Sequence, residues 1–211
     1  MNIRNIRRKL AVFLTAASVT VSSAVSFAYP DIENHWARNQ IKSLQDYGIV
    51  NGYSDGTFKP DNYITRAEAS KIVAQGVMCS KNPTFEYLYS DVNESDWFAD
   101  SVMSLYHANA INGYGDGTFR PEAQITRAEF SKMVAKIIDM SLGSKYEVFT
   151  DTENHWAMTE IGRLAKKGMV NGYPDGSFRP DNPITRAEAS YIAYKAIKHI
   201  NLKKLIDYGV V

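Results

Sequence analysis

Residues 51–68 read NGYSDGTFKPDNYITRAE, residues 112–129 read NGYGDGTFRPEAQITRAE, and residues 171–188 read NGYPDGSFRPDNPITRAE. Twelve of the eighteen positions are identical in all three stretches, which identifies them as internal repeats. A tryptophan lies 30 residues before the arginine of each TRAE tetrapeptide. Since the repeated pattern extends over most of the chain, it decides the architecture, which we expect to be built from three copies of one unit.

Each repeat is predicted to fold as a helix, an ordered loop and a second helix. The first helix starts near the tryptophan and ends before Gly48, Asn109 or Gly168, residue types that tolerate the left-handed conformation after a helix. The second helix starts at TRAE, where threonine and glutamate have the spacing of a capping box. Apolar residues then recur at helical spacing, as in the series Phe130, Met133, Val134, Ile137 and Ile138.

The apolar positions predict how the repeats combine. In the first helix of repeat one we expect Trp36, Ile41 and Leu44 to lie along one face. The loop phenylalanines are expected to plug the core; they are Phe58, Phe119 and Phe178. A repeat of some 50 residues buries too little apolar surface to be stable alone. The predicted fold is therefore mainly α, with three helix–loop–helix repeats around a pseudo-threefold core.

The beginning of the chain differs in composition from the rest. The first 28 residues carry four basic groups and no acid, and an apolar run at 10–21 leads to Ser26 and Ala28. This pattern is typical of a secretory signal peptide cleaved after Ala28, and the run is shorter than the ~20 residues that span a bilayer. The predicted divisions are a signal peptide at 1–28, repeats at 29–85, 86–145 and 146–201, and a short tail at 202–211.

Charge and cysteine content exclude several classes of protein. Without the first 28 residues the chain has 20 basic and 23 acidic residues, so the net charge changes from +1 to −3. A mildly acidic body argues against nonspecific binding to nucleic acid or to anionic lipid. Cys79 is the only cysteine, so no intrachain disulfide can form, and burial of the core must hold the fold. We interpret Cys79 as a small apolar residue at a helix end.

The Asp…Trp opening, the NGYxDGTFxP loop and the TRAE helix start resemble the S-layer homology domain family in all three repeats. This resemblance implies a three-pronged, pseudo-trimeric helical domain. It also implies a secreted cell-surface protein that binds, without a covalent bond, a secondary cell-wall polysaccharide joined to peptidoglycan. Such a polymer typically carries ketal-linked pyruvate. In the family the TRAE arginine is a main ligand contact, and the grooves lie between neighbouring repeats.

The residues offer chemistry for such a ligand. A pyruvyl ketal presents a carboxylate, and an arginine at the first helical position stands beside free amides and the positive end of the helix dipole. Its planar guanidinium can hold a carboxylate through two hydrogen bonds. Tryptophans can pack on sugar rings, and glycines let backbone donors come close. The predicted ligand-binding residues are Arg66, Arg127, Arg186, Trp36, Trp97, Trp156, Gly52, Gly113, Gly172, Asp31, Asp91 and Asp151.

Each of these residue types also has a purely structural interpretation. The arginines can pair with a carboxylate of the adjacent repeat, and the tryptophans can be core anchors at helix starts. The aspartates can cap the opening turn, or they can orient the arginine or ligand hydroxyls. Small polar side chains near the start of the second helices can face a groove; they are Ser70, Ser131 and Ser190.

No enzyme activity, metal site or cofactor is predicted. The Asp-Gly of the loop resembles part of an EF-hand calcium loop. With Gly56 at loop position 6, however, Tyr53 stands at position 3 and Asn62, rather than a glutamate, at position 12, which spoils that site. The histidines do not recur as a set, and the chain has no nucleophile elbow, zinc spacing or phosphate loop. The alternative function is a cell-surface protein-interaction adaptor or S-layer assembly module whose grooves hold an acidic peptide.

Overall fold

The computed structural model describes residues 29–77, 84, 86–138 and 148–207. The predicted signal peptide, Cys79 and the last four residues of the predicted tail lie outside these ranges. The described residues form six α-helices and no β-strand, which confirms the predicted fold class. The helices, after a short 3-10 turn at Pro30–Ile32 (η2), are α1 (Arg38–Asp46), α2 (Arg66–Val77), α3 (Ala99–His107), α4 (Arg127–Ile137), α5 (Met158–Lys166) and α6 (Arg186–Asp207).

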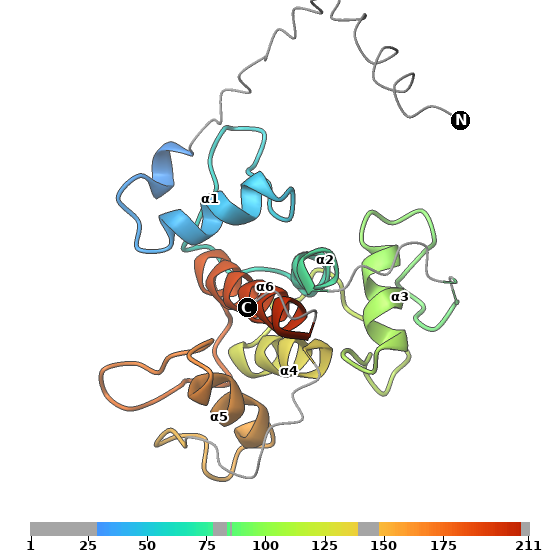
Figure 1. Ribbon diagram of the computed structural model, residues 1–211. Helices are drawn as coiled ribbons and strands as arrows, with labels where there is room; N and C mark the ends of the chain where they lie inside the picture. Colours follow the sequence, from blue (N-terminus) through green and yellow to red (C-terminus); the bar gives the residue numbers. More distant parts are fainter. Residues whose placement is uncertain (1–28, 78–83, 85, 139–147, 208–211) are drawn as a thin grey trace, which may run out of the picture.

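The second helices of the three repeats form the centre of the molecule. Helices α2, α4 and α6 pack against one another, and α1, α3 and α5 lie outside them with their loops as three prongs (Figure 1). This arrangement confirms the expected pseudo-threefold core. It buries the apolar faces that a single repeat would leave open to water.

The outer helices pack mainly on a neighbouring repeat rather than on their own. Helix α3 of repeat two contacts α2 of repeat one, and α5 of repeat three contacts α4 of repeat two. Helix α1 completes the series by packing against α6 of repeat three (Figure 1). The three repeats therefore form a closed ring, in which the first repeat is joined to the last.

A triangle of backbone hydrogen bonds joins the repeats around the core. The Ile64 amide donates to the Ile184 carbonyl (3.2 Å), the Ile184 amide to the Ile125 carbonyl (3.0 Å), and the Ile125 amide to the Ile64 carbonyl (3.2 Å). All three side chains are fully buried. These isoleucines precede the three TRAE tetrapeptides, so the triangle fixes where each second helix begins.

The ends of the helices agree with the local sequence. Gly48, Asn109 and Gly168 have positive φ angles of 70°, 54° and 65° and follow α1, α3 and α5, as predicted. At the start of α4, Thr126 accepts from the Glu129 amide and its own amide donates to the Glu129 carboxylate. The same capping box is present at Thr65 with Glu68 and at Thr185 with Glu188.

The buried residues confirm most of the predicted core. The three loop phenylalanines are buried, and so are Ile41 and Leu44 on the inner face of α1. Trp36, in contrast, is 59% exposed, so the prediction that it shares this face is wrong. Helix α1 begins at Arg38, and Trp36 belongs to the preceding turn. The helical periodicity therefore does not extend to the tryptophan.

Candidate binding grooves

The TRAE arginine of each repeat is buried and reaches into the next repeat. Arg66 is only 4% exposed. Its Nε donates to the Phe119 carbonyl (2.9 Å), and its Nη2 donates to the Asn112 carbonyl (2.9 Å). Its Nη1 lies 3.4 Å from Glu129 Oε1, and the guanidinium lies over the Phe119 ring. Since a guanidinium has five N–H donors, these three hydrogen bonds leave two for other acceptors.

The same contacts recur around the ring. Arg127 donates to the Phe178 and Asn171 carbonyls and pairs with Glu188. Arg186 closes the ring through the equivalent groups of repeat one; they are Phe58, Asn51 and Glu68. The arginines thus have the inter-repeat carboxylate that was one of the two interpretations of the sequence. That partner is the glutamate of the neighbouring capping box.

The helix N-termini are not open to a ligand in the way the sequence suggested. The Arg66 amide donates to the Ala123 carbonyl (2.8 Å) and the Ala67 amide to the Pro121 carbonyl (2.9 Å). Equivalent bonds cover the starts of α4 and α6. The prediction of free amides beside the arginine is therefore wrong, because the loop of the next repeat supplies their acceptors. The first two amides of each of these helices are therefore not available to an anion.

Three grooves surround the exposed side of the arginines, and each is built by all three repeats. Every groove has a floor of loop and second helix from one repeat, the arginine of the preceding repeat and the tryptophan of the following repeat. Groove 1 contains Asn51, Glu68, Lys71, Trp97 and Arg186. Groove 2 contains Arg66, Asn112, Glu129, Lys132 and Trp156. Groove 3 contains Trp36, Arg127, Asn171, Glu188 and Tyr191.

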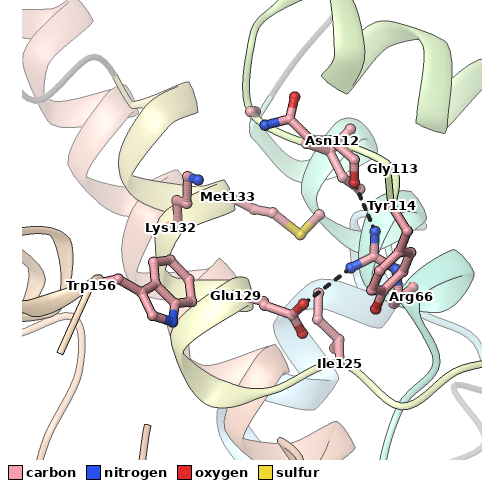
Figure 2. Close-up of a pocket in the computed structure, with 11 residues that line it drawn as sticks. Arg66, Asn112, Gly113, Tyr114, Ile125, Glu129, Lys132, Met133 and Trp156 are labelled. Carbon is pink, nitrogen blue, oxygen red and sulfur yellow. Dashed lines mark hydrogen bonds and ion pairs between the residues drawn. The ribbon is translucent and has the colours of Figure 1, made fainter. Parts of the chain in front are cut away.

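Figure 2 shows how charges and aromatic rings are placed in groove 2. Arg66 and Tyr114 lie on one side, Lys132 and Trp156 on the other, and Glu129 lies between them. The amine of Lys132 is 5.3 Å from the centre of the Trp156 ring. The groove therefore combines two cations, one carboxylate and an aromatic face, a set that suits an anionic sugar.

The tryptophans lie in the grooves rather than in the core. Trp36, Trp97 and Trp156 are 59%, 56% and 56% exposed, so the interpretation as core anchors is wrong. The structure brings each of them into the same groove as a TRAE arginine, although the two belong to different repeats. An exposed aromatic ring in a concave site offers its face to a ligand.

The loop glycines make room for an aromatic ring of their own repeat. A Cβ at Gly52 would lie 2.2 Å from Tyr29 Cε1, and the Gly52 amide donates to the Tyr29 hydroxyl (2.6 Å). Gly113 and Gly172 pack likewise against Tyr89 and Phe149. Gly113 and Gly172 also line grooves 2 and 3, whereas Gly52 is not among the residues that line groove 1.

The opening aspartates lie outside the three grooves and hold the loop. Asp31 accepts from the amides of Phe58 (3.0 Å) and Lys59 (2.6 Å), where Lys59 has a positive φ of 56°. The Phe58 carbonyl is in turn an acceptor for Arg186. Asp31 therefore acts on Arg186 indirectly, by holding the Phe58 residue whose carbonyl accepts a hydrogen bond from that arginine. The other two repeats have the same bonds, at Asp91 and Asp151.

The serines of the second helices do not face the grooves. Ser70, Ser131 and Ser190 are fully buried. The hydroxyls of Ser70 and Ser190 donate to the carbonyls of Arg66 and Arg186, one turn earlier in the same helix. The interpretation that they can face a binding groove is wrong, because all three side chains are buried and none is among the residues that line the grooves.

The aspartate of each Asp-Gly pair makes its hydrogen bonds and its ion pair with residues of its own loop. Asp55 accepts from the Thr57 hydroxyl (2.6 Å) and pairs with Lys59 (2.9 Å). These contacts, the Thr57 hydroxyl above all, lower the pKa of Asp55 to about 2. The equivalent bond from Ser177 lowers the pKa of Asp175 to about 2, and the pKa of Asp116 is lowered in the same way. Nearby, burial raises the pKa of Tyr53.

Sequence reasoning missed the residue that follows each TRAE arginine by five positions. Lys71, Lys132 and Tyr191 stand there, and each lines a groove beside a tryptophan. The signal was present, because aligning the repeats places these three residues at one position. A search for residues identical in all three repeats does not find this position, because it holds lysine twice and tyrosine once.

A known protein family matches each of the three repeats. The S-layer homology domain family matches residues 28–70, 88–131 and 148–190, which is more than half of the chain. Among the described residues, no helix is both long enough and apolar enough to cross a membrane.

Several known proteins are similar over most of this chain. A cellulosome-anchoring protein of Acetivibrio thermocellus is 38% identical over 71% of the chain and 35% of its own length. Cell surface glycoprotein 1 of the same organism is 36% identical over 71% of the chain and 7% of its own length. S-layer protein EA1 of Bacillus anthracis is 28% identical over 84% of the chain and 21% of its own length. The chain thus spans about a third or less of these relatives. With the family match over all three repeats, the chain belongs to the S-layer homology domain family.

Proposed function

We propose that this chain is a cell-wall anchoring module that binds a secondary cell-wall polysaccharide through its three grooves. The observation that carries the proposal is the composition of each groove, in which an arginine, an exposed tryptophan and a loop come from three different repeats. Such a site exists only when the three repeats are packed together. It is concave, accessible and equipped for a polar, ring-shaped ligand.

The groove side chains can divide the recognition of a pyruvylated sugar among them. The arginine retains two N–H donors for a carboxylate oxygen, and the lysine of grooves 1 and 2 adds a second cation. The tryptophan offers a face for the apolar C–H groups of the sugar ring. The capping-box glutamate remains an acceptor for hydroxyls. Ketal-linked pyruvate is the substituent that best accounts for the cationic side chains.

Three grooves on one small domain favour a polymeric ligand. A strand that occupies one groove raises the effective concentration of its next units at the other two, so weak single sites combine into firm attachment. This attachment needs no covalent bond and no enzymatic step. The relatives are named as anchoring, cell-surface and S-layer proteins, and we place this chain in the same cell-surface setting.

The exposed tryptophans provide a sharper test than the buried arginines. A triple variant Trp36→Ala, Trp97→Ala and Trp156→Ala removes one wall of every groove without opening the core. We expect it to lose at least tenfold in co-sedimentation with purified wall sacculi. A matched control replaces Tyr47 and Tyr63 by alanine, since both are exposed aromatic residues outside the grooves.

Extraction of the polymer tests the ligand itself. Sacculi from which acid has removed the secondary polysaccharide should no longer sediment the unaltered protein. Binding that survives extraction, or binding undiminished in the tryptophan variant, would contradict the proposal. The adaptor alternative makes the opposite prediction, which is capture of a defined acidic protein in the absence of wall material.

A further inference from the structure

The three grooves share their arginine, glutamate and tryptophan but differ beside the tryptophan. Grooves 1 and 2 have Lys71 and Lys132 at this position, and groove 3 has Tyr191. The amines of Lys71 and Lys132 each lie 5.3 Å from the centre of a tryptophan ring. In groove 3 the Tyr191 ring takes the place of the amine, 5.7 Å from the Trp36 ring.

This exchange changes the charge of the groove. Arginine, lysine and glutamate give grooves 1 and 2 a net positive charge. In groove 3, Arg127 faces Glu188, and the residues that the structure describes as lining this groove include no second cation. The amine of Lys195 lies 5.4 Å from the centre of the Tyr191 ring but is not among these lining residues. A groove lined by one cation and one carboxylate prefers a carboxylate ligand over a neutral substituent less strongly than a groove with a second lining cation does.

The arginine of groove 3 is also more closely paired with its glutamate. The Arg127 Nη1 to Glu188 Oε1 distance is 2.5 Å, against 3.4 Å for Arg66 with Glu129 and 3.2 Å for Arg186 with Glu68. A short charge-assisted bond leaves less of the guanidinium charge for a ligand.

Groove 3 offers more aromatic surface instead. Trp36 and Tyr191 are adjacent rings inclined at 59°, and Tyr173 also lines the groove. Two neighbouring rings suit the apolar face of an uncharged sugar, because its C–H groups can contact both.

We propose that groove 3 recognises an uncharged sugar ring, whereas grooves 1 and 2 select the anionic units of the same polymer. This inference rests on the proposed function. One domain then binds charged and uncharged units of the polymer in different grooves, and Tyr191 is the residue that gives groove 3 its preference.

The three tryptophans make each groove separately observable. The chain has three tryptophans, and each lines a different groove, so their indole N–H resonances in a two-dimensional NMR spectrum report one groove each. The probes are an N-acetylhexosamine methyl glycoside with ketal-linked pyruvate and the same glycoside without the ketal. We expect the Trp97 and Trp156 resonances to respond at roughly fivefold lower concentration of the pyruvylated probe, the effect of one added ion pair. The Trp36 resonance should respond to both probes within about twofold.

Exchange of the single differing residue should transfer the preference. Tyr191→Lys should give Trp36 the preference for the pyruvylated probe, and Lys132→Tyr should remove it at Trp156. Trp97 is the internal control in both variants, because neither substitution touches groove 1. Its unchanged chemical shift and unchanged preference also show that the ring of repeats remains folded.

The outcomes separate this inference from the proposed function. If Trp36 of the unaltered chain prefers the pyruvylated probe as strongly as Trp97 and Trp156 do, the assignment of groove 3 is wrong and the wall-binding function stands. The same holds if Tyr191→Lys leaves the response of Trp36 unchanged. If neither probe shifts any indole resonance, the proposed function fails, and this inference fails with it.

Discussion

The contacts of the TRAE arginine in the structure hold neighbouring repeats together, whatever ligand the arginine also binds. Arg127 is 5% exposed, and three of its N–H groups bond to repeat three. The sequence predicted its place at the start of a helix and its affinity for a carboxylate. Sequence could not decide which carboxylate is nearest, because Glu188 lies 61 residues further along the chain. That proximity depends on how repeat three packs on repeat two, which no local pattern encodes.

Arg127→Ala should therefore destabilise the whole domain. Removal of the guanidinium leaves Glu188 without its cation and two carbonyls without a donor, so we expect a loss of about 3 kcal/mol in the free energy of unfolding. Denaturant titration measures this loss. Arg38→Ala is the matched control, because Arg38 is exposed and should change stability by less than ~0.5 kcal/mol. A loss no larger than that of the control would contradict the structural role.

The glycine that follows the loop asparagine is a packing position. Gly52→Ala places a Cβ 2.2 Å from the Tyr29 ring and 2.7 Å from the Thr57 carbonyl oxygen. We expect a loss of roughly 2 kcal/mol, measured by thermal or denaturant unfolding. Gly115→Ala is the control in the same loop type, because a Cβ there meets no atom within 4 Å. Equal stability of the two variants would show that the clash is relieved at no cost.

At the scale of elements, helix limits were easier to predict than helix partners. The capping boxes and the left-handed residues after α1, α3 and α5 depend on neighbouring residues alone, and sequence placed them correctly. Packing of α3 on α2 of the preceding repeat depends on contacts between residues far apart in the chain, and sequence did not predict it. The backbone of α6 also continues through residues 202–207, which sequence assigned to a tail.

The loops should depend on pH through their aspartates. Asp55 and Asp175 have pKa values of about 2 in the folded protein, below the ~4 of an unfolded chain. Their stabilisation is therefore complete above pH ~4 and is lost as the pH falls towards 2. Asp55→Asn should have a lower melting temperature than the unaltered protein at neutral pH. The difference should shrink between pH 4 and pH 2, and a constant difference would contradict this account.

At the scale of the whole molecule, the closed ring predicts cooperative unfolding. Open repeat arrays can lose a terminal repeat first, since it has one neighbour. Here α1 packs against α6, so the first and last repeats each have two neighbours. Sequence predicted three copies around a common core but not which helix closes the ring.

Ile41→Ala tests this closure. Ile41 is fully buried in α1, and its truncation should cost about 3 kcal/mol. Because the ring is one cooperative unit, hydrogen exchange should accelerate in α6 and α4 as much as in α1. Circular dichroism and tryptophan fluorescence should report the same unfolding midpoint. Acceleration confined to α1 would indicate independent repeats.

The triangle of isoleucine hydrogen bonds has a mechanical consequence for an anchor. A pull on a polymer strand seated in one groove acts on three repeats at once, since each groove is assembled from all three. The load is then shared by the three backbone bonds between Ile64, Ile125 and Ile184, and no terminal repeat is available to peel away first. Tension that breaks one of these hydrogen bonds must distort the other two. The domain should therefore unfold in a single step at one high force, rather than one repeat at a time.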